Sequence, residues 1–324
     1  MCTAVSYRTR DHYFGRTLDL EGSFEETVTI TPRLFPFSFH RLPRLVRHHA
    51  IIGMAHVADG YPLYYDAINE KGLSMAGLNF PGNAVYHPEQ EGKDNVAPFE
   101  LIPWVLGQCT TVPEARALLE RVNVLSHSFR SDLPATPLHW LIADREEAIV
   151  AEPVAEGLNI YDDPVKVMTN NPPFPTQLWN LSNFMGLSRD QLVNRFSSGL
   201  DLKPYSRGMG GMGLPGDLSS ASRFVKAAFT RLNSVCGMSE EESVSQFFHI
   251  LGAVEQQRGC VRMEDGSYEI TLYTSCCNTD QGIYYYTTYG NRQISAVDLH
   301  RENLDGTFLI SHPLVRGEQI RFQN

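Results

Sequence analysis

Runs of alternating apolar and polar residues dominate both ends of the chain and predict β-strands. Residues Thr3 to Arg8 form one such run, and a turn at Thr9-Arg10-Asp11 leads into a second, His12 to Asp19. A hairpin of this kind brings the end of its second strand back beside the N-terminus. Further strands are predicted over Thr27 to Ile30, Ala50 to Ala58, Tyr61 to Ile68, Leu73 to Leu78, His139 to Ala143, Ala148 to Glu152, Leu158 to Tyr161, Val165 to Thr169, Tyr268 to Cys277, Gly282 to Tyr289, Gln293 to His300 and Phe308 to Ile310.

Helical patterns occupy two positions between these groups of strands. Phe99 to Cys109 is mostly apolar, and Thr111-Val112-Pro113-Glu114 opens a second helix with a capping hydroxyl, an early proline and an early acid. Later, a helix begins among Ser219 to Ser222, and Ser239 opens another with a capping box. Strands, then helices, then strands again, without regular βαβ alternation, predict an α+β fold with layered antiparallel sheets.

With 42% hydrophobic residues the chain can bury a large core, and its length allows one large domain or two; we expect a single domain over residues 1–324. The formal net charge of −10 argues against a nucleic-acid partner. The apolar runs are too short to span a membrane and the start lacks a signal peptide, so we expect a cytoplasmic protein. The histidines and cysteines show no metal-binding spacing, so we expect neither metal nor cofactor.

The second residue, Cys2, is the strongest candidate for chemistry. Met1 precedes a small residue and is therefore expected to be removed, which makes Cys2 the first residue of the mature chain. A thiol with a pKa of about 8.5 then lies beside an α-amine with a pKa of about 7.7 to 8, so one residue supplies both a nucleophile and a base. The alternative is an incidental small apolar residue at position two.

Other candidates lie where predicted strands or helices end. The first hairpin places Arg16 and Asp19 beside the terminus, although a surface ion pair would give the same pattern. Asn79 ends a strand before a Pro-Gly turn, and Asn170 follows another strand; each is either an oxyanion donor or an ordinary turn asparagine. Arg223 lies in the first turn of a helix, where a cation opposes the helix dipole, so it is oddly placed for stability alone.

Four blocks of sequence resemble the choloylglycine hydrolase family, the N-terminal nucleophile hydrolases that include bile salt hydrolases and penicillin V acylases. The first block is Met-Cys-Thr followed by Phe-Gly-Arg-Thr-Leu-Asp, which is how such chains begin. The others are Asn69 to Gly82, Val167 to Pro172 and Leu214 to Phe224, in order and at suitable separations. Together they are spread over some two-thirds of the chain.

The resemblance implies the four-layer αββα sandwich of N-terminal nucleophile hydrolases, with two antiparallel sheets. It implies a thiolate nucleophile at Cys2, with Asp19 orienting the amine. It also implies oxyanion donors at Asn79 and Asn170, with Arg16 and Arg223 favouring the thiolate and the bound carbonyl.

The substrate implied by the resemblance is a conjugated bile salt, a steroid acid linked through an amide to glycine or taurine. Asn79 favours this class, because penicillin-acylating relatives often carry tyrosine there. Apolar side chains near Phe24, Phe35 and Ile52 are predicted to line the sterol pocket, and Arg207, in a glycine-rich loop, to meet an acidic leaving group. Penicillin V or another N-acyl amide is the alternative substrate, and a non-catalytic lipid-binding protein with the same fold is the alternative of another class. Relatives are commonly homotetramers, which predicts a homo-oligomer here.

Overall fold

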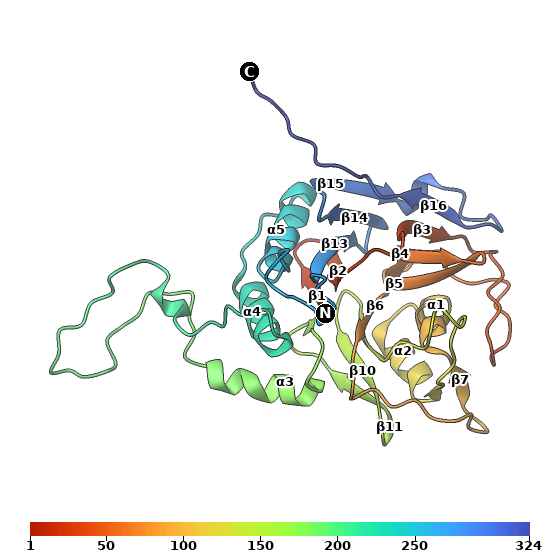
Figure 1. Ribbon diagram of the computed structural model, residues 1–324, viewed down its shortest axis with the longest axis horizontal. Helices are drawn as coiled ribbons and strands as arrows, with labels where there is room; N and C mark the ends of the chain where they lie inside the picture. Colours follow the sequence, from red (N-terminus) through yellow and green to blue (C-terminus); the bar gives the residue numbers. More distant parts are fainter.

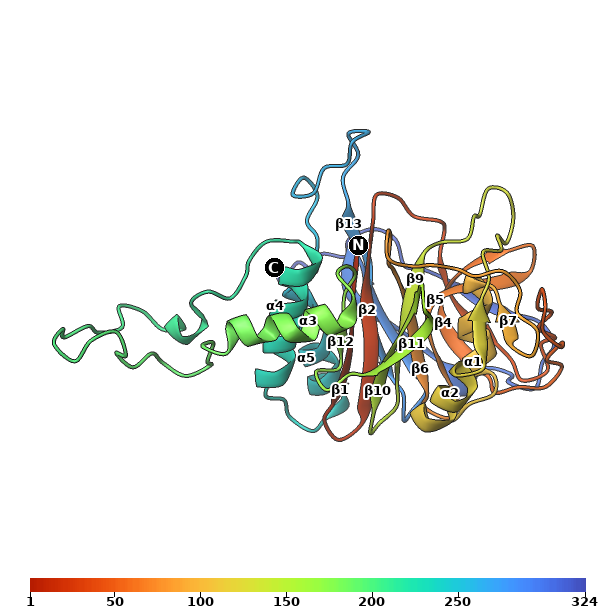
Figure 2. The same ribbon diagram turned by 90° about the horizontal axis from the view of Figure 1, so that it is seen from below.

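Two antiparallel sheets face each other, and each is covered on its outer face by helices. The computed structural model describes residues 1–324. In Figure 2, helices α4 (Ser220–Asn233) and α5 (Glu240–Gly252) lie on one side of the sheets, and α1 (Leu101–Leu106) and α2 (Val112–Leu119) lie on the other. This arrangement confirms the predicted α+β class and the four-layer αββα sandwich. None of the helices reaches the length and apolar character that crossing a bilayer requires.

The sheet beneath α4 and α5 has six strands and contains the N-terminus in its interior. Its order is β12 (Val167–Met168), β1 (Cys2–Arg8), β2 (His12–Leu20), β13 (Ile270–Asn278), β14 (Ile283–Thr288) and β15 (Asn291–Asp298). Strand β1 pairs with β2 on one side and β12 on the other, with Ala4 opposite both Arg16 and Met168. The first strand is therefore held on both edges.

The second sheet has eight strands and lies beneath α1 and α2. Its order is β11 (Gly157–Asp162), β10 (Ala148–Val154), β9 (Leu138–Ala143), β6 (Ser74–Asn79), β5 (Tyr61–Asn69), β4 (Ile51–Ala58), β3 (Thr27–Thr31) and β16 (Ile310–Pro313). The last strand differs from the prediction over Phe308 to Ile310. It begins at Ile310 and pairs with β3, so the chain crosses back to the other sheet.

The remaining elements are short. Strands β7 (Asp94–Val96) and β8 (Val122–Val124) form a small parallel pair, and α3 (Phe174–Asn180) follows β12. Between α3 and α4, residues 186–218 form a long arm that reaches away from the body of the molecule (Figure 1).

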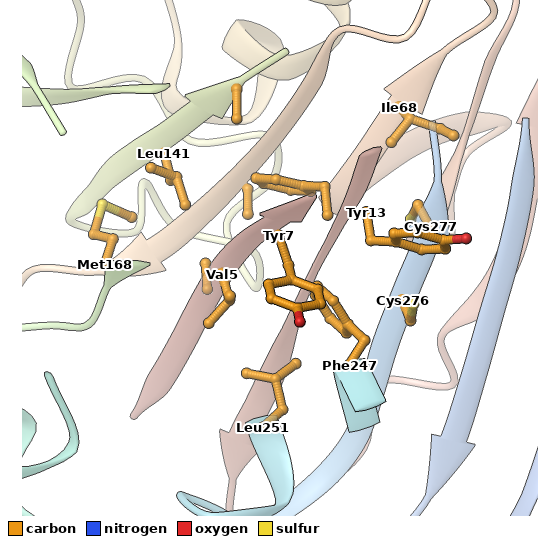
Figure 3. Close-up of a cluster of buried hydrophobic side chains, with 14 of the residues drawn as sticks. Val5, Tyr7, Tyr13, Ile68, Leu141, Met168, Phe247, Leu251, Cys276 and Cys277 are labelled. Atoms are coloured by element: carbon orange, nitrogen blue, oxygen red, sulfur yellow. The ribbon is translucent and has the colours of Figure 1, made fainter. Parts of the chain in front are cut away.

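Two hydrophobic clusters hold the layers together. A cluster of 38 buried residues joins the facing sides of the sheets to α4 and α5, and Figure 3 shows Val5, Phe247 and Cys277 within it. A second cluster of 24 buried residues packs α1 and α2 on the eight-stranded sheet. Strand β4 contributes to both, since Ile51 belongs to the second cluster and Ile52 to the first. Both faces of this strand are therefore buried.

Candidate active site

Cys2 begins the interior strand β1 and is 3% exposed. Its partner across the ladder is Leu18, next to Asp19, and Asn170 lies two residues beyond the end of the neighbouring strand β12. The strand order therefore brings residues from both sides of the sheet to the N-terminus. All six cysteines, Cys2 included, are free thiols.

The Asn170 side chain is oriented by two donors. Its Oδ1 accepts from the backbone N–H of Cys2 at 2.8 Å and from Nη2 of Arg223 at 2.9 Å. Its Nδ2 donates to the backbone oxygen of Asn79 at 2.7 Å. The carbonyl end of this amide must face Cys2, because both neighbours there are hydrogen-bond donors.

This geometry changes the interpretation of Asn170. The resemblance assigned its amide nitrogen to an oxyanion, whereas the structure engages that nitrogen with Asn79 and leaves one Nδ2 hydrogen for another acceptor. The contact that sequence reasoning missed is the one from the Asn170 carbonyl to the nitrogen of Cys2. The oxyanion roles of Asn79 and Asn170 stay predictions.

Arg223 reaches Cys2 from the first turn of α4. It is 1% exposed, and its Nη1 donates to the backbone oxygen of Cys2 at 2.5 Å and to Oγ1 of Thr3 at 2.6 Å. Its Nε donates to the backbone oxygen of Leu218 at 3.0 Å. These contacts explain the unfavourable position of a cation at a helix N-terminus: the guanidinium turns away from the helix and binds the first strand.

Asp19 is fully buried beside this arginine. Its carboxylate accepts from Oγ1 of Thr271 at 2.6 Å and from Oγ1 of Thr17 at 3.1 Å, and lies 4.0 Å from Nη1 of Arg223. Burial raises the pKa of Asp19, while Arg223 and the N-terminal ammonium act to lower it. The carboxylate thus acts on the terminus through its charge, and only the backbone oxygen of Asp19 touches the Met1 ammonium, at 2.6 Å.

Arg16 bridges the two sheets from β2. Its Nη1 donates to the backbone oxygens of Tyr65 and Gly77, which belong to β5 and β6, and its Nη2 is buried without a partner. Burial disfavours its charge, but Cys2, Asp66 and other acidic groups nearby raise the pKa of Arg16 above its usual value. The guanidinium is therefore held as a cation near Cys2, and its effect on the thiolate stays a prediction.

Two neighbours of the terminus had no signal in the sequence. Glu269, which is 5% exposed, accepts from the Met1 ammonium at 2.8 Å, and Thr271 holds the Asp19 carboxylate. Both lie at the start of β13, 250 residues or more along the chain from their partners. Within an alternating strand pattern nothing distinguishes them from other polar positions.

An apolar cavity of about 350 Å³ opens beside the Arg16 bridge. Tyr65 and Gly77, whose backbone oxygens bind Arg16, are part of its wall, so the cavity adjoins the site. The other lining residues are Phe24, His56, Leu63, Tyr64, Pro98, Phe99, Ile102, Phe129, Asp132, Leu133, Pro134, Ala135, Thr136 and Leu138. A larger and more polar hollow, of about 590 Å³, lies between α5 and the six-stranded sheet, and Thr271, which donates to the Asp19 carboxylate, is part of its wall.

The predicted pocket residues are divided by the structure. Phe24 lines the apolar cavity. Ile52 does not, because it is fully buried in the cluster between the sheets. Phe35 packs on Phe37 at 5.1 Å and against the second core cluster, so its segment is a packed excursion and not a pocket wall. Arg207 is exposed on the arm and makes no hydrogen bond or ion pair with the residues around Cys2.

Comparison with known proteins finds a matching family and several related chains. A family model described as linear amide C–N hydrolases, choloylglycine hydrolase family, matches residues 2–312. A bile salt hydrolase/transferase of Lactiplantibacillus plantarum is 56% identical over 314 residues, which is 97% of each chain. A bile salt hydrolase/transferase of Clostridium perfringens is 38% identical over 311 residues, 94% of each chain.

Solved structures of related proteins also superpose on this chain. A mutant of the conjugated bile acid hydrolase from Clostridium perfringens superposes with a TM-score of 0.93 at 36% identity, over the whole of both chains. Penicillin V acylase from Agrobacterium tumefaciens superposes with a TM-score of 0.75 at 18% identity, over 97% of this chain and 92% of that one. The second likeness establishes a shared fold only.

Proposed function

This chain belongs to the choloylglycine hydrolase family of linear amide C–N hydrolases, and from that premise we propose that it cleaves the amide bond of glycine- or taurine-conjugated bile salts through a thioester on Cys2. Relatives named as bile salt hydrolases match nearly the whole chain. The observation that carries the mechanism is the contact from the Cys2 nitrogen to Asn170, because it fixes the direction of the future α-amine.

The chemistry begins once Met1 has been removed. The Cys2 thiol gives its proton to the α-amine, and the sulfur bonds to the substrate carbonyl carbon while the carbonyl electrons move to oxygen. The resulting ammonium then protonates the departing nitrogen as the C–N bond breaks, which leaves a thioester. A water gives a proton to the amine as its oxygen attacks the thioester carbon, and the C–S bond then breaks: the steroid acid is released and the ammonium returns its proton to the sulfur.

The other residues support this reaction by charge and by hydrogen bonds. Arg16 and Arg223 place two buried cations near the sulfur and the first carbonyl, which favours the thiolate. Asn79 and the remaining Nδ2 hydrogen of Asn170 are the proposed oxyanion donors. Asp19 favours the ammonium through its charge, as the influence of the terminus on its pKa indicates.

The apolar cavity suits the acyl part of the proposed substrate. Ten of its 16 lining residues are hydrophobic, which fits a steroid better than a charged group. In this proposal the steroid acid lies in the cavity with its carboxamide at the Arg16 end. The glycine or taurine group then points away from the apolar wall.

Side-by-side hydrolysis of glycocholate, taurocholate and penicillin V tests the proposal. We expect turnover of the two bile salts by protein whose intact mass shows loss of Met1, and a loss of at least 10³-fold in kcat for Cys2→Ser. Faster hydrolysis of penicillin V would select the alternative substrate. Processed protein that binds bile salt without hydrolysing it would support the non-catalytic alternative, and full activity with Met1 retained would refute the mechanism.

We also propose that the protein is a cytoplasmic homo-oligomer, a tetramer by analogy with its relatives. The arm supports association, because Met185, Val193, Phe196 and Tyr205 on or beside it are each 75% or more exposed, and large apolar side chains rarely stand in water this way. Light scattering should give a mass four times that of the chain, and Phe196→Ser with Tyr205→Ser should lower it. Cell fractionation tests the location.

A further inference from the structure

Met1 occupies a small polar site beside the nucleophile. Its ammonium donates to the backbone oxygen of Asp19 at 2.6 Å and to Oε2 of Glu269 at 2.8 Å, and its backbone oxygen accepts from the N–H of Asp19 at 2.9 Å. The Glu269 side chain is 6% exposed, and its Oε1 is buried without any partner. Removal of Met1 therefore leaves two acceptors and a donor without these partners in a partly buried space.

We propose that Glu269 is a positioning residue of the Cys2 amine, which it holds through one water molecule that takes the place of the Met1 nitrogen in the processed chain. This inference rests on the proposed thioester mechanism. The nitrogens of consecutive residues lie about 2.7 to 3.7 Å apart, depending on the backbone angle between them, so a water near that place can reach the Cys2 nitrogen. It donates to the Asp19 oxygen and to Glu269 Oε2 and accepts from Cys2, which satisfies three partners, as buried waters usually do.

The water completes the orientation of the amine. A neutral α-amine has two hydrogens and one lone pair. One hydrogen keeps the contact with Oδ1 of Asn170. The second hydrogen takes the direction of the former peptide bond and points into the space that Met1 leaves, toward the water. With both hydrogens engaged, the lone pair remains to take the proton of the thiol.

The charge of Glu269 also acts on the site. The charged groups around the terminus are Cys2 on β1, Arg16 and Asp19 on β2, Arg223 on α4 and Glu269 itself. Burial raises the pKa of Glu269, while the terminal ammonium acts to lower it. As an anion, Glu269 favours the ammonium and disfavours the thiolate. Removal of the Glu269 charge therefore moves the titrations of the Cys2 amine and the Cys2 thiol toward lower pH.

The pH dependence of Cys2 alkylation tests this role without using a bile salt. Processed full-length protein is treated with iodoacetamide, and the Cys2 peptide is followed by mass spectrometry, because Cys236 and Cys260 are also accessible. In Glu269→Gln we expect the midpoint of alkylation to move down by about one pH unit. Glu264→Gln, an exposed change in the same loop, should leave it unmoved. Glu269→Asp, which keeps the charge, should bring the midpoint back toward that of the parent.

Equal midpoints for Glu269→Gln and the parent would overturn the proposal. This result is separable from failure of the proposed function, since in that case no variant hydrolyses glycocholate while the alkylation profiles still differ. If Glu269→Gln does not fold, a crystal structure of the processed parent decides. A water joining the Cys2 nitrogen, the Asp19 oxygen and Glu269 supports the proposal, and a Glu269 side chain turned out of this space contradicts it.

Discussion

Replacing Arg223 by methionine removes the group that holds the first strand to helix α4. Methionine keeps much of the volume and the apolar stem but none of the donors. The guanidinium makes four hydrogen bonds, to the backbone oxygens of Cys2 and Leu218, to Oγ1 of Thr3 and to Oδ1 of Asn170. In the methionine variant these four acceptors lose the guanidinium as their hydrogen-bond donor.

The magnitude follows from burial. Arg223 is 1% exposed and lies 4.0 Å from the fully buried Asp19 carboxylate, so its loss leaves an uncompensated charge. Breaking such a buried pair costs about 3 to 5 kcal/mol of folding free energy, a large part of the usual total. Two of the lost bonds fix Cys2 and Asn170, and a loss of about 3 kcal/mol of transition-state stabilisation corresponds to roughly a 10²-fold fall in kcat/KM.

Urea unfolding and glycocholate hydrolysis, both at a temperature where every variant is folded, measure the two effects. Arg223→Lys keeps a cation near Asp19 but not the planar fork, so it should recover stability more than activity. Lys226→Met, on the same helix with no side-chain hydrogen bond to another residue, is the matched control. A methionine variant that matches the control in both unfolding free energy and kcat/KM would show that these four contacts do not support the site.

Three further changes probe the fold and the cavity. Burial raises the pKa of Asp163 to about 7, so the folded chain keeps a proton that the unfolded chain loses near pH 4. Unfolding free energy should therefore fall by up to about 4 kcal/mol between about pH 4 and 7, and Asp163→Asn should flatten that part of a denaturation series; an unchanged slope would contradict this. Gly15→Ala places a Cβ 2.0 Å from the backbone oxygen of Ser275, so we expect a loss of about 3 kcal/mol or more in calorimetry, and a normal melting temperature would count against it. Ala135→Phe fills the cavity and should raise KM for glycocholate at least tenfold with little change in melting temperature, whereas an unchanged KM would place the steroid elsewhere.

Strand positions and the gathering of the site were accessible from the sequence. The first hairpin brings Arg16 and Asp19 to the terminus because antiparallel pairing leaves no other geometry. The ends of β6 and β12 carry Asn79 and Asn170 to the same place. Alternation and turn residues were sufficient for these elements, since each depends on local pattern.

The direction of side chains was not accessible in the same way. Strand β4 is buried on both faces, so its composition cannot tell that Ile52 faces the other sheet and not the cavity. The orientation of the Asn170 amide depends on donors from β1 and α4, which only the assembled layers bring together. Phe35 was misjudged and Glu269 was missed for the same reason: their contacts depend on how the segments of the chain pack together.

Because β1 lies between two neighbouring strands, we expect two events to occur in a fixed order: removal of Met1 and formation of the sheet. In the folded chain Met1 is held through its ammonium, by the Asp19 backbone oxygen and Glu269, and through its backbone oxygen, by the Asp19 N–H. We therefore expect Met1 to be removed before β2 and β12 pair with the first strand. On the proposed mechanism, a chain that folds with Met1 in place lacks the free Cys2 amine, so we expect it to be folded but inactive.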